Sequence, residues 1–128
     1  MRQLLLVLLL AHAANAATAD LTAQSQAQLS SAQTATGASA NEADLGTSGR
    51  RGSLIVQSRN TAGTATVEVQ VNCLAGTADY ATVAGTSQAL TVSAVAVTIV
   101  GPGCRYRAYV TACSTCSVTS TATSIGAK

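Results

Sequence analysis

The chain has 128 residues, about the length of one domain, and its charges nearly balance: seven Lys and Arg, five Asp and Glu, and one His. This balance gives no long-range attraction to nucleic acid or to an anionic membrane surface, so we expect neither as a partner. Because Trp and Phe are absent, the core must consist mainly of aliphatic side chains, and cross-links or assembly with other copies would help to stabilise it.

Residues 1–16 (MRQLLLVLLLAHAANA) have the three parts of a secretory signal peptide. Arg2 supplies the positive charge, Leu4–Leu10 is a short apolar core, and Ala14–Ala16 is a small-x-small cleavage site. A hydrophobic first strand or helix is the alternative, but the apolar run is too short to cross a bilayer, which takes about 20 residues. We expect cleavage after Ala16 and a secreted or periplasmic protein, with a virion as the alternative location. Cleavage removes His12, so the mature chain would contain no histidine.

After the signal peptide, residues 17–47 are rich in Ala, Thr, Ser and Gln and contain few large apolar side chains. This composition predicts a linker or tether, with a weak helix over residues 19–33 as the alternative. We assign residues 17–27 to a flexible N-terminal segment and residues 28–125 to one β-sandwich domain.

Residues 53–72 contain two predicted strands joined by a turn. Ser53–Ser58 is an apolar run of strand length, and Asn60–Gly63 supplies turn-forming residues. In Thr64–Asn72, polar and apolar residues alternate, which is typical of a strand with one buried face. The valines are expected to face the interior and the polar residues to face outward: Val67, Val69 and Val71 against Thr66, Glu68 and Gln70.

Two further strands are expected between residues 80 and 100. Tyr80–Ala84 is short, and residues 88–100 alternate with a break in phase near Ser93-Ala94. Because a shift of one residue turns every side chain to the other face, this break predicts a bulge or a turn. The apolar residues on its two sides have opposite parity: Leu90 and Val92 before it, and Val95, Val97 and Ile99 after it.

Gly101-Pro102-Gly103 predicts another turn, after which residues 105–112 alternate again. Ser117–Ser124 is rich in threonine, and its polar character is typical of a strand at the edge of a sheet. Short strands between turns, without helical periodicity, predict an all-β protein. We expect a single small antiparallel β-sandwich, immunoglobulin-like or jelly-roll-like, that is cross-linked by disulfides.

Three segments carry a resemblance to a known group of proteins. They are AQTATGASANEADLGTSGRRGSLIVQSRNTAGTATVEVQV, YATVAGTSQALTV and GPGCRYRAYVTAC, within residues 28–124. Their Thr-Ala-Thr-Gly, Asp-Leu-Gly, alternating valines and late aromatic-Arg-Ala strand resemble small β-sandwich proteins of tailed-phage and prophage structural modules. The resemblance implies a structural role, surface or virion proteins as partners, and an early hairpin over residues 30–46. Proteins of that group often have a Trp at the position of Tyr80, and they usually lack a signal peptide and these four cysteines.

The four cysteines are expected to form structural disulfides. Zinc sites usually contain two closely spaced pairs of ligands, whereas only Cys113 and Cys116 are close together in this sequence. A redox Cys-x-x-Cys motif needs a helix that begins at its first cysteine, and no helical pattern follows. Three pairings are possible, and we prefer Cys73 with Cys104 and Cys113 with Cys116. The first would join two strand ends, and the second would span a hairpin turn at Ser114-Thr115.

No constellation of residues indicates catalysis, so we expect neither enzyme activity nor a cofactor or metal. Without a histidine in the mature chain, Ser-His-Asp and Cys-His mechanisms are excluded. A pair of catalytic carboxylates would have to converge in one cleft, but Glu68 lies within a predicted strand and Asp79 in a predicted loop.

A possible partner contact consists of Arg59, Arg105, Arg107 and Tyr109. With Tyr106 nearby, these residues could bind a glycan, a phosphate or a protein partner. The alternative is a solvated sheet face on which the arginine stems cover apolar surface. We expect Tyr80 to lie in the core rather than at a binding site.

These features predict a non-catalytic, exported structural or assembly protein, which would be a surface or virion-type β-sandwich subunit. The alternative is a secreted binding module, such as an adhesin or a glycan-binding domain. We expect self-association into an oligomer or polymer, because the net charge is low and Ser117–Ser124 would leave backbone groups unpaired at a sheet edge. Residues 17–45 would then supply the linking strand to a neighbouring copy.

Overall fold

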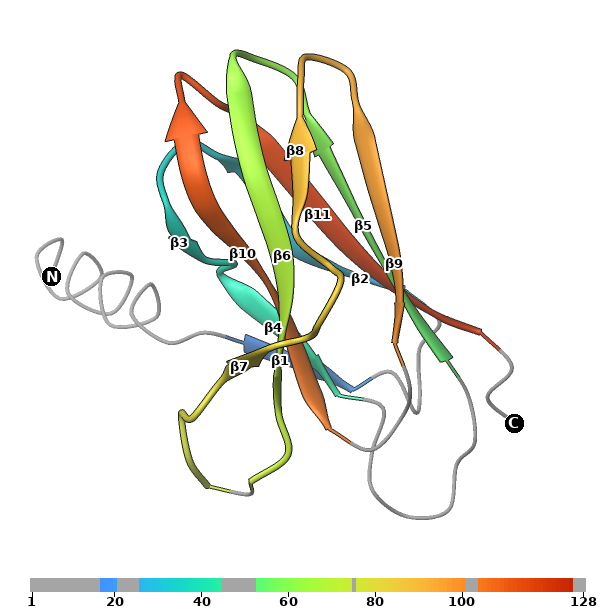
Figure 1. Ribbon diagram of the computed structural model, residues 1–128. Coiled ribbons are helices and arrows are strands. Elements are labelled where there is room, and N and C mark those ends of the chain that lie inside the picture. Colours follow the sequence, from blue (N-terminus) through green and yellow to red (C-terminus); the bar gives the residue numbers. More distant parts are fainter. Residues whose placement is uncertain (1–16, 21–25, 45–52, 75, 101–103, 126–128) are drawn as a thin grey trace, which may run out of the picture.

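The computed structural model describes residues 17–20, 26–44, 53–74, 76–100 and 104–125 (Figure 1). Within these ranges the chain forms strands and no helix. The strands are β1 (Ala17–Asp20), β2 (Gln26–Gln33), β3 (Gly37–Ala38), β4 (Asn41–Asp44), β5 (Ser53–Asn60), β6 (Thr64–Asn72), β7 (Ala81–Thr82), β8 (Gln88–Leu90), β9 (Val95–Val100), β10 (Arg105–Ser114) and β11 (Val118–Ile125). The predicted signal peptide and the predicted turn at residues 101–103 lie outside the described residues.

The strands form two sheets that pack face to face (Figure 1). Sheet A has the order β1-β4-β10-β6-β7, with β3 also paired to β10 and β8 also paired to β6. Sheet B has the order β2-β11-β5-β9. The pairings are antiparallel, apart from the parallel pair of β1 and β4. The prediction of an all-β antiparallel sandwich with two disulfides is confirmed.

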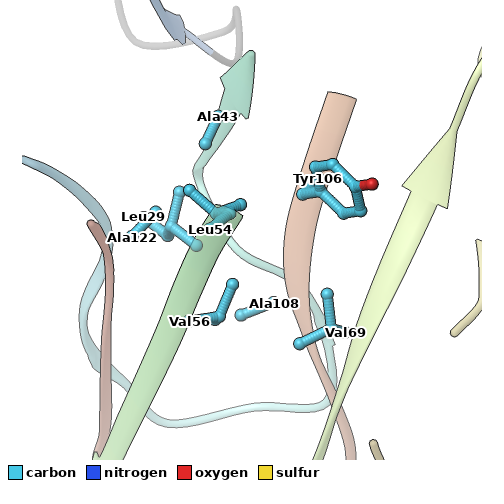
Figure 2. Close-up of a cluster of buried hydrophobic side chains, with 8 residues drawn as sticks. All are labelled: Leu29, Ala43, Leu54, Val56, Val69, Tyr106, Ala108 and Ala122. Atoms are coloured by element: carbon cyan, nitrogen blue, oxygen red, sulfur yellow. The ribbon is translucent and has the colours of Figure 1, made fainter. Parts of the chain in front are cut away.

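Alternating residues along each strand turn one face of each sheet toward a common core. On β6, Val67 and Val69 are each 3% exposed, whereas Glu68 between them is only half-buried, as predicted. Full burial of such a side chain contributes roughly 1.5–3 kcal/mol. Tyr106 is the largest side chain of the cluster in Figure 2, and burial raises its pKa. That cluster contains Leu29, Ala43, Leu54, Val56, Val69, Tyr106, Ala108 and Ala122.

Four turns cross between the sheets at one end of the sandwich, which we call the crossing end (Figure 1). They join β2 to β3, β5 to β6, β8 to β9 and β10 to β11. In the second of these turns Gly63 has a φ of +50°, and a Cβ atom there would collide with the backbone carbonyl of Ser114. Glycine is therefore required where the β5–β6 turn approaches the β10–β11 turn.

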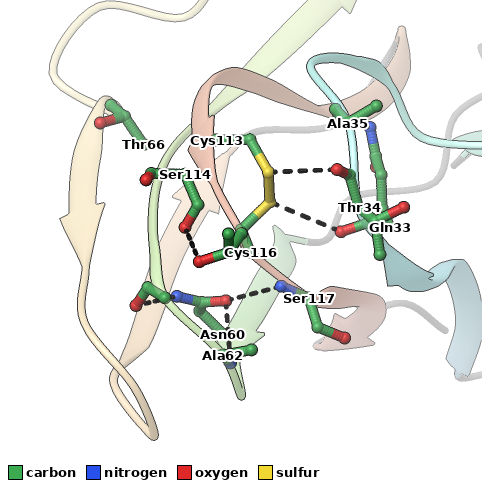
Figure 3. Close-up of a disulfide and its surroundings, with 12 residues drawn as sticks. Gln33, Thr34, Ala35, Asn60, Ala62, Thr66, Cys113, Ser114, Cys116 and Ser117 are labelled. Atoms are coloured by element: carbon green, nitrogen blue, oxygen red, sulfur yellow. Dashed lines mark hydrogen bonds between the residues drawn. A yellow bond between two sulfur atoms is a disulfide. The ribbon is translucent and has the colours of Figure 1, made fainter.

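Asn60 connects three of the crossing turns. Its side chain is 0% exposed, and its Nδ2 donates hydrogen bonds to the carbonyls of Gly63 (3.1 Å) and Leu90 (3.4 Å). Its Oδ1 accepts from the amides of Ala62 (3.4 Å) and Ser117 (3.0 Å), as Figure 3 shows. One buried amide thus satisfies backbone groups from the β5–β6, β8–β9 and β10–β11 turns.

The N-terminal region differs from the prediction of a linker with a flexible segment at residues 17–27. The structure places β1, β2, β3 and β4 there, and β1 pairs with β4. β2 pairs with β11 in sheet B, whereas β3 and β4 pair with β10 in sheet A. Of the residues expected to form an early hairpin (30–46), those that the structure describes, 30–44, are part of the sandwich, but they cross between the sheets instead of forming a hairpin. Composition misses β2 because Leu29 is its one large apolar residue, and pairing with β11 compensates for this.

The prediction that Ser117–Ser124 is an edge strand is wrong. β11 lies between β2 and β5, so both of its edges are paired. Its inward side chains are buried, and the hydroxyls of Ser120 and Ser58 form a buried hydrogen bond of 2.8 Å across the β11–β5 pair. Threonine-rich composition describes the outer face of β11 and not its position in the sheet.

The break in phase near Ser93-Ala94 is a turn, which is one of the two predicted outcomes, and Ser93 has a φ of +66°. β8 and β9 belong to different sheets, so the change of phase is a change of sheet. On β9 the small residue Ala96 packs into the core at 4% exposure. Val95 and Val97 consequently face outward and are 45% and 49% exposed.

Candidate functional site

The disulfide between Cys73 and Cys104 fixes the loop that follows β6. It joins the end of β6 to the start of β10, with a Cα–Cα distance of 4.5 Å. Asn72 donates to the Thr77 carbonyl (2.7 Å) and accepts from the Leu74 amide (2.8 Å) within the same loop. The bridge therefore has a structural role, as predicted from its place between strand ends.

The second disulfide, Cys113–Cys116, closes the β10–β11 turn with a Cα–Cα distance of 5.3 Å. It spans a crossing between the two sheets and not the predicted β-hairpin, because β10 and β11 do not belong to one sheet. Its sulfur atoms lie 3.3 Å from the Thr34 carbonyl oxygen and 3.7 Å from that of Gln33 (Figure 3). It thus packs the β2–β3 turn against the β10–β11 turn. All four cysteines of the chain are in disulfides.

Metal-ligating and acid–base groups are sparse in the described part of the chain. No three His, Cys, Asp or Glu side chains lie close enough there to hold a metal ion. Two shallow hollows, of about 290 and 380 Å³, are lined by uncharged side chains. Among the described residues there is also no helix that is long and apolar enough to cross a membrane.

Charged and aromatic side chains gather on the outer face of sheet A. Three of the four predicted contact residues lie there on β10, on the face opposite to the buried Tyr106 and Ala108. Cross-strand register places β6 residues beside them, with Gln70 opposite Arg107 and Glu68 opposite Tyr109. We call this group the arginine–tyrosine patch: Glu42, Glu68, Gln70, Tyr80, Arg105, Arg107 and Tyr109.

Arg105 contacts β4 and the disulfide-bonded loop that follows β6. Its Nη1 is 3.4 Å from Glu42 Oε1, and the side chains of this ion pair are 27% and 14% exposed. Its Nη2 donates to the carbonyls of Thr77 (2.7 Å) and Leu74 (3.3 Å). Arg105 therefore links β10, β4 and the disulfide-bonded loop, and its hydrogen-bonding groups are used inside the protein.

Arg107 lies against two tyrosine rings. Its guanidinium carbon is 3.7 Å from the ring centroid of Tyr80 and 5.6 Å from that of Tyr109, and its Nε donates to Gln70 Oε1 (2.9 Å). The Tyr80 hydroxyl donates to Glu42. Tyr80 is thus a half-buried part of the patch, and its predicted place in the core is wrong. The core tyrosine is Tyr106, which is 5% exposed.

Arg59 does not join the patch. It is exposed on β5 in sheet B, with Val95 and Thr119 as its cross-strand neighbours. Its residue type alone had placed it in the predicted contact, which did not include Tyr80 or Glu42. Those two residues reach the patch from a loop and from β4, and no local pattern marks this proximity.

The second notable surface is the outer edge of sheet B, which we call the β9 edge (Val95–Val100). Among the described strands, β9 pairs with β5 alone, so the backbone groups on its other side have no strand partner. The exposed side chains of Val95 and Val97 lie beside this open edge.

Comparison of the chain with protein-family models, with curated proteins and with solved structures found no match.

Proposed function

We propose that this chain is an exported, non-catalytic structural subunit that assembles with copies of itself through the β9 edge. The observation that supports the proposal most strongly is the position of β9. It is an edge strand whose two outward valines are about half exposed, at 45% and 49%. An open edge offers unpaired backbone donors and acceptors to another strand.

The β9 edge lacks the features that usually prevent such pairing. Proteins protect edge strands with lysine, proline, bulges or inward charges, and the sequence VAVTIV contains no charged residue and no proline. Short segments of this kind, with β-branched residues and no net charge, pair readily with copies of themselves. Antiparallel pairing of β9 with β9 would continue sheet B from one copy into the next.

Low net charge and location also support the proposal. Without Arg2, which leaves with the predicted signal peptide, six cations and five anions remain, so copies would repel each other little. Two disulfides are stable in an oxidising compartment, which agrees with export to the periplasm or beyond. A surface layer or a virion-type particle would use such a subunit.

The alternative function, a secreted binding module, is supported by a different observation, the arginine–tyrosine patch. The patch lies on sheet A and the β9 edge belongs to sheet B, so one subunit can use both.

Sedimentation velocity of the secreted protein and of Val97→Lys tests the assembly. Val97 is the suitable position because it lies opposite the uncharged Gln57, whereas Val95 lies opposite Arg59. In an antiparallel β9–β9 pair, two lysines would face each other and repel. We expect the wild type to associate at micromolar concentration, and the variant to associate at least about tenfold more weakly.

Leu74→Lys is the matched control, because Leu74 is also an exposed apolar side chain (58%) and lies in the disulfide-bonded loop. It should associate as the wild type does. A monomeric wild type at high micromolar concentration would refute the proposal. If Val97→Lys and Leu74→Lys weakened association equally, β9 would not be the interface.

A further inference from the structure

We propose that Arg107 anchors the carboxylate of an acidic sugar residue on the outer face of sheet A. This binding site goes beyond the assembly function and does not depend on it. The guanidinium of Arg107 is held firmly in place. Its Nε is tied to Gln70, one face lies against Tyr80, and Tyr109 lies nearby on the same strand. A side chain that is already ordered loses little further conformational entropy when it binds a ligand.

Within the part of the chain that the structure describes, Nη1 and Nη2 of Arg107 donate to no acceptor. Arg105 is different, since its Nη1 and Nη2 reach Glu42 and two backbone carbonyls. An ordered guanidinium with a free fork of N–H groups matches a planar carboxylate, which it binds with two parallel hydrogen bonds.

Glu68 supplies a complementary acceptor next to this fork. Its Oε1 accepts hydrogen bonds from Gln70 (2.9 Å) and Thr82 (2.9 Å), whereas Oε2 accepts none from the described residues. Glu68 is the diagonal cross-strand neighbour of Arg107, and such neighbours have Cα atoms roughly 7–8 Å apart. The side chain of Gln70 lies between the two and hydrogen-bonds to both. This spacing suits one sugar ring with its substituents, which would place its carboxylate at Arg107 and donate a hydrogen bond from a hydroxyl to Glu68.

The charge of the patch selects the ligand class. Arg105 and Arg107 are balanced by Glu42 and Glu68, so the patch would repel a run of closely spaced anions about as much as it attracts them. A ligand that carries one carboxylate on each sugar ring, among several hydroxyls, fits this balance better than a strongly acidic peptide does. The tyrosine rings add apolar surface against which the C–H groups of a sugar can pack.

Titration calorimetry with trigalacturonate measures this binding directly. The fully methyl-esterified trisaccharide is the matched ligand, because it keeps the hydroxyls and loses the carboxylate charges. We expect trigalacturonate to bind with a dissociation constant of about 1 mM and the ester to bind at least about tenfold more weakly. A tetrapeptide of alternating Asp and Gly provides carboxylates without the sugar and should also bind at least about tenfold more weakly.

Arg107→Lys keeps the charge and removes the planar fork, so it should weaken trigalacturonate binding at least about tenfold. Arg59→Lys, on sheet B, makes the same change outside the patch and should leave the affinity unaltered. Unchanged thermal unfolding of both variants would show that they are folded. Val97→Lys should also bind like the wild type, which separates this site from the assembly. No binding at about 10 mM, equal binding by Arg107→Lys, or equal binding of the ester or the peptide would overturn the proposal.

Discussion

At the scale of single residues, the side-chain amide of Asn60 forms hydrogen bonds with three of the four turns at the crossing end. It satisfies two carbonyls and two backbone amides from three turns while it is itself 0% exposed. Asn60→Ala would remove this partner from four backbone groups, of which the Leu90 carbonyl is buried and the other three are part-buried. Each buried group left unsatisfied costs about 1–3 kcal/mol. Because the neighbouring turns can relax in part, we expect the free energy of unfolding to fall by about 3 kcal/mol, measured by urea denaturation.

Asn41→Ala is the control for this prediction. The Asn41 side chain donates one hydrogen bond, to the Gln28 carbonyl (3.1 Å), at an exposed position. Its loss should cost about 1 kcal/mol or less. Similar losses for the two variants would show that Asn60 does not hold the crossing turns together.

At the scale of elements, β6 and β9 contain valines that the sequence alone does not distinguish. Val69 is 3% exposed on β6 and Val97 is 49% exposed on β9. Val69→Ala should therefore lower the free energy of unfolding by about 1–3 kcal/mol. The same change at Val97 should cost less than about 0.5 kcal/mol, since it opens no cavity. Equal losses in urea denaturation would mean that the faces of these strands are assigned wrongly.

Three strands, β6, β2 and β9, show what local sequence can and cannot predict. Strict alternation in TATVEVQVN is a property of neighbouring residues, so both the strand and its buried face follow from it. The sheet that a strand joins depends on distant partners, as for β2, which is recognisable only beside β11. The outward turn of Val95 and Val97 likewise depends on Ala96 filling the space between the sheets.

The candidate site likewise has one part that the local sequence predicts and another that it does not. Arg105, Arg107 and Tyr109 share one face of a single strand, so their alternation already predicts that they lie together. Glu42 and Tyr80 complete the site from other elements, through an ion pair and a stacked ring. Such contacts follow from the packing of the whole fold and from no local spacing.

At the scale of the whole molecule, the two disulfides lie at opposite ends of the β6–β10 pair. Cys73–Cys104 lies next to the Asn72–Arg105 pair, and Cys113–Cys116 next to the Thr64–Ser114 pair. In sheet B, β11 is enclosed by β2 and β5, so among the described strands the open edges of this sheet are β2 and β9. β2 contains one large apolar residue, the buried Leu29, whereas β9 presents exposed valines. The contrast makes β9 the edge at which copies would join.

Amide hydrogen exchange as a function of protein concentration tests this claim most directly, with β2 as an internal reference. Pairing of β9 between copies would bury its open backbone amides in new hydrogen bonds, which slows their exchange. We expect the protection of residues 95–100 to rise with concentration while that of residues 26–33 stays constant. Protection that rises in β2 instead, or that is constant in β9 over the range in which the protein associates, would contradict it.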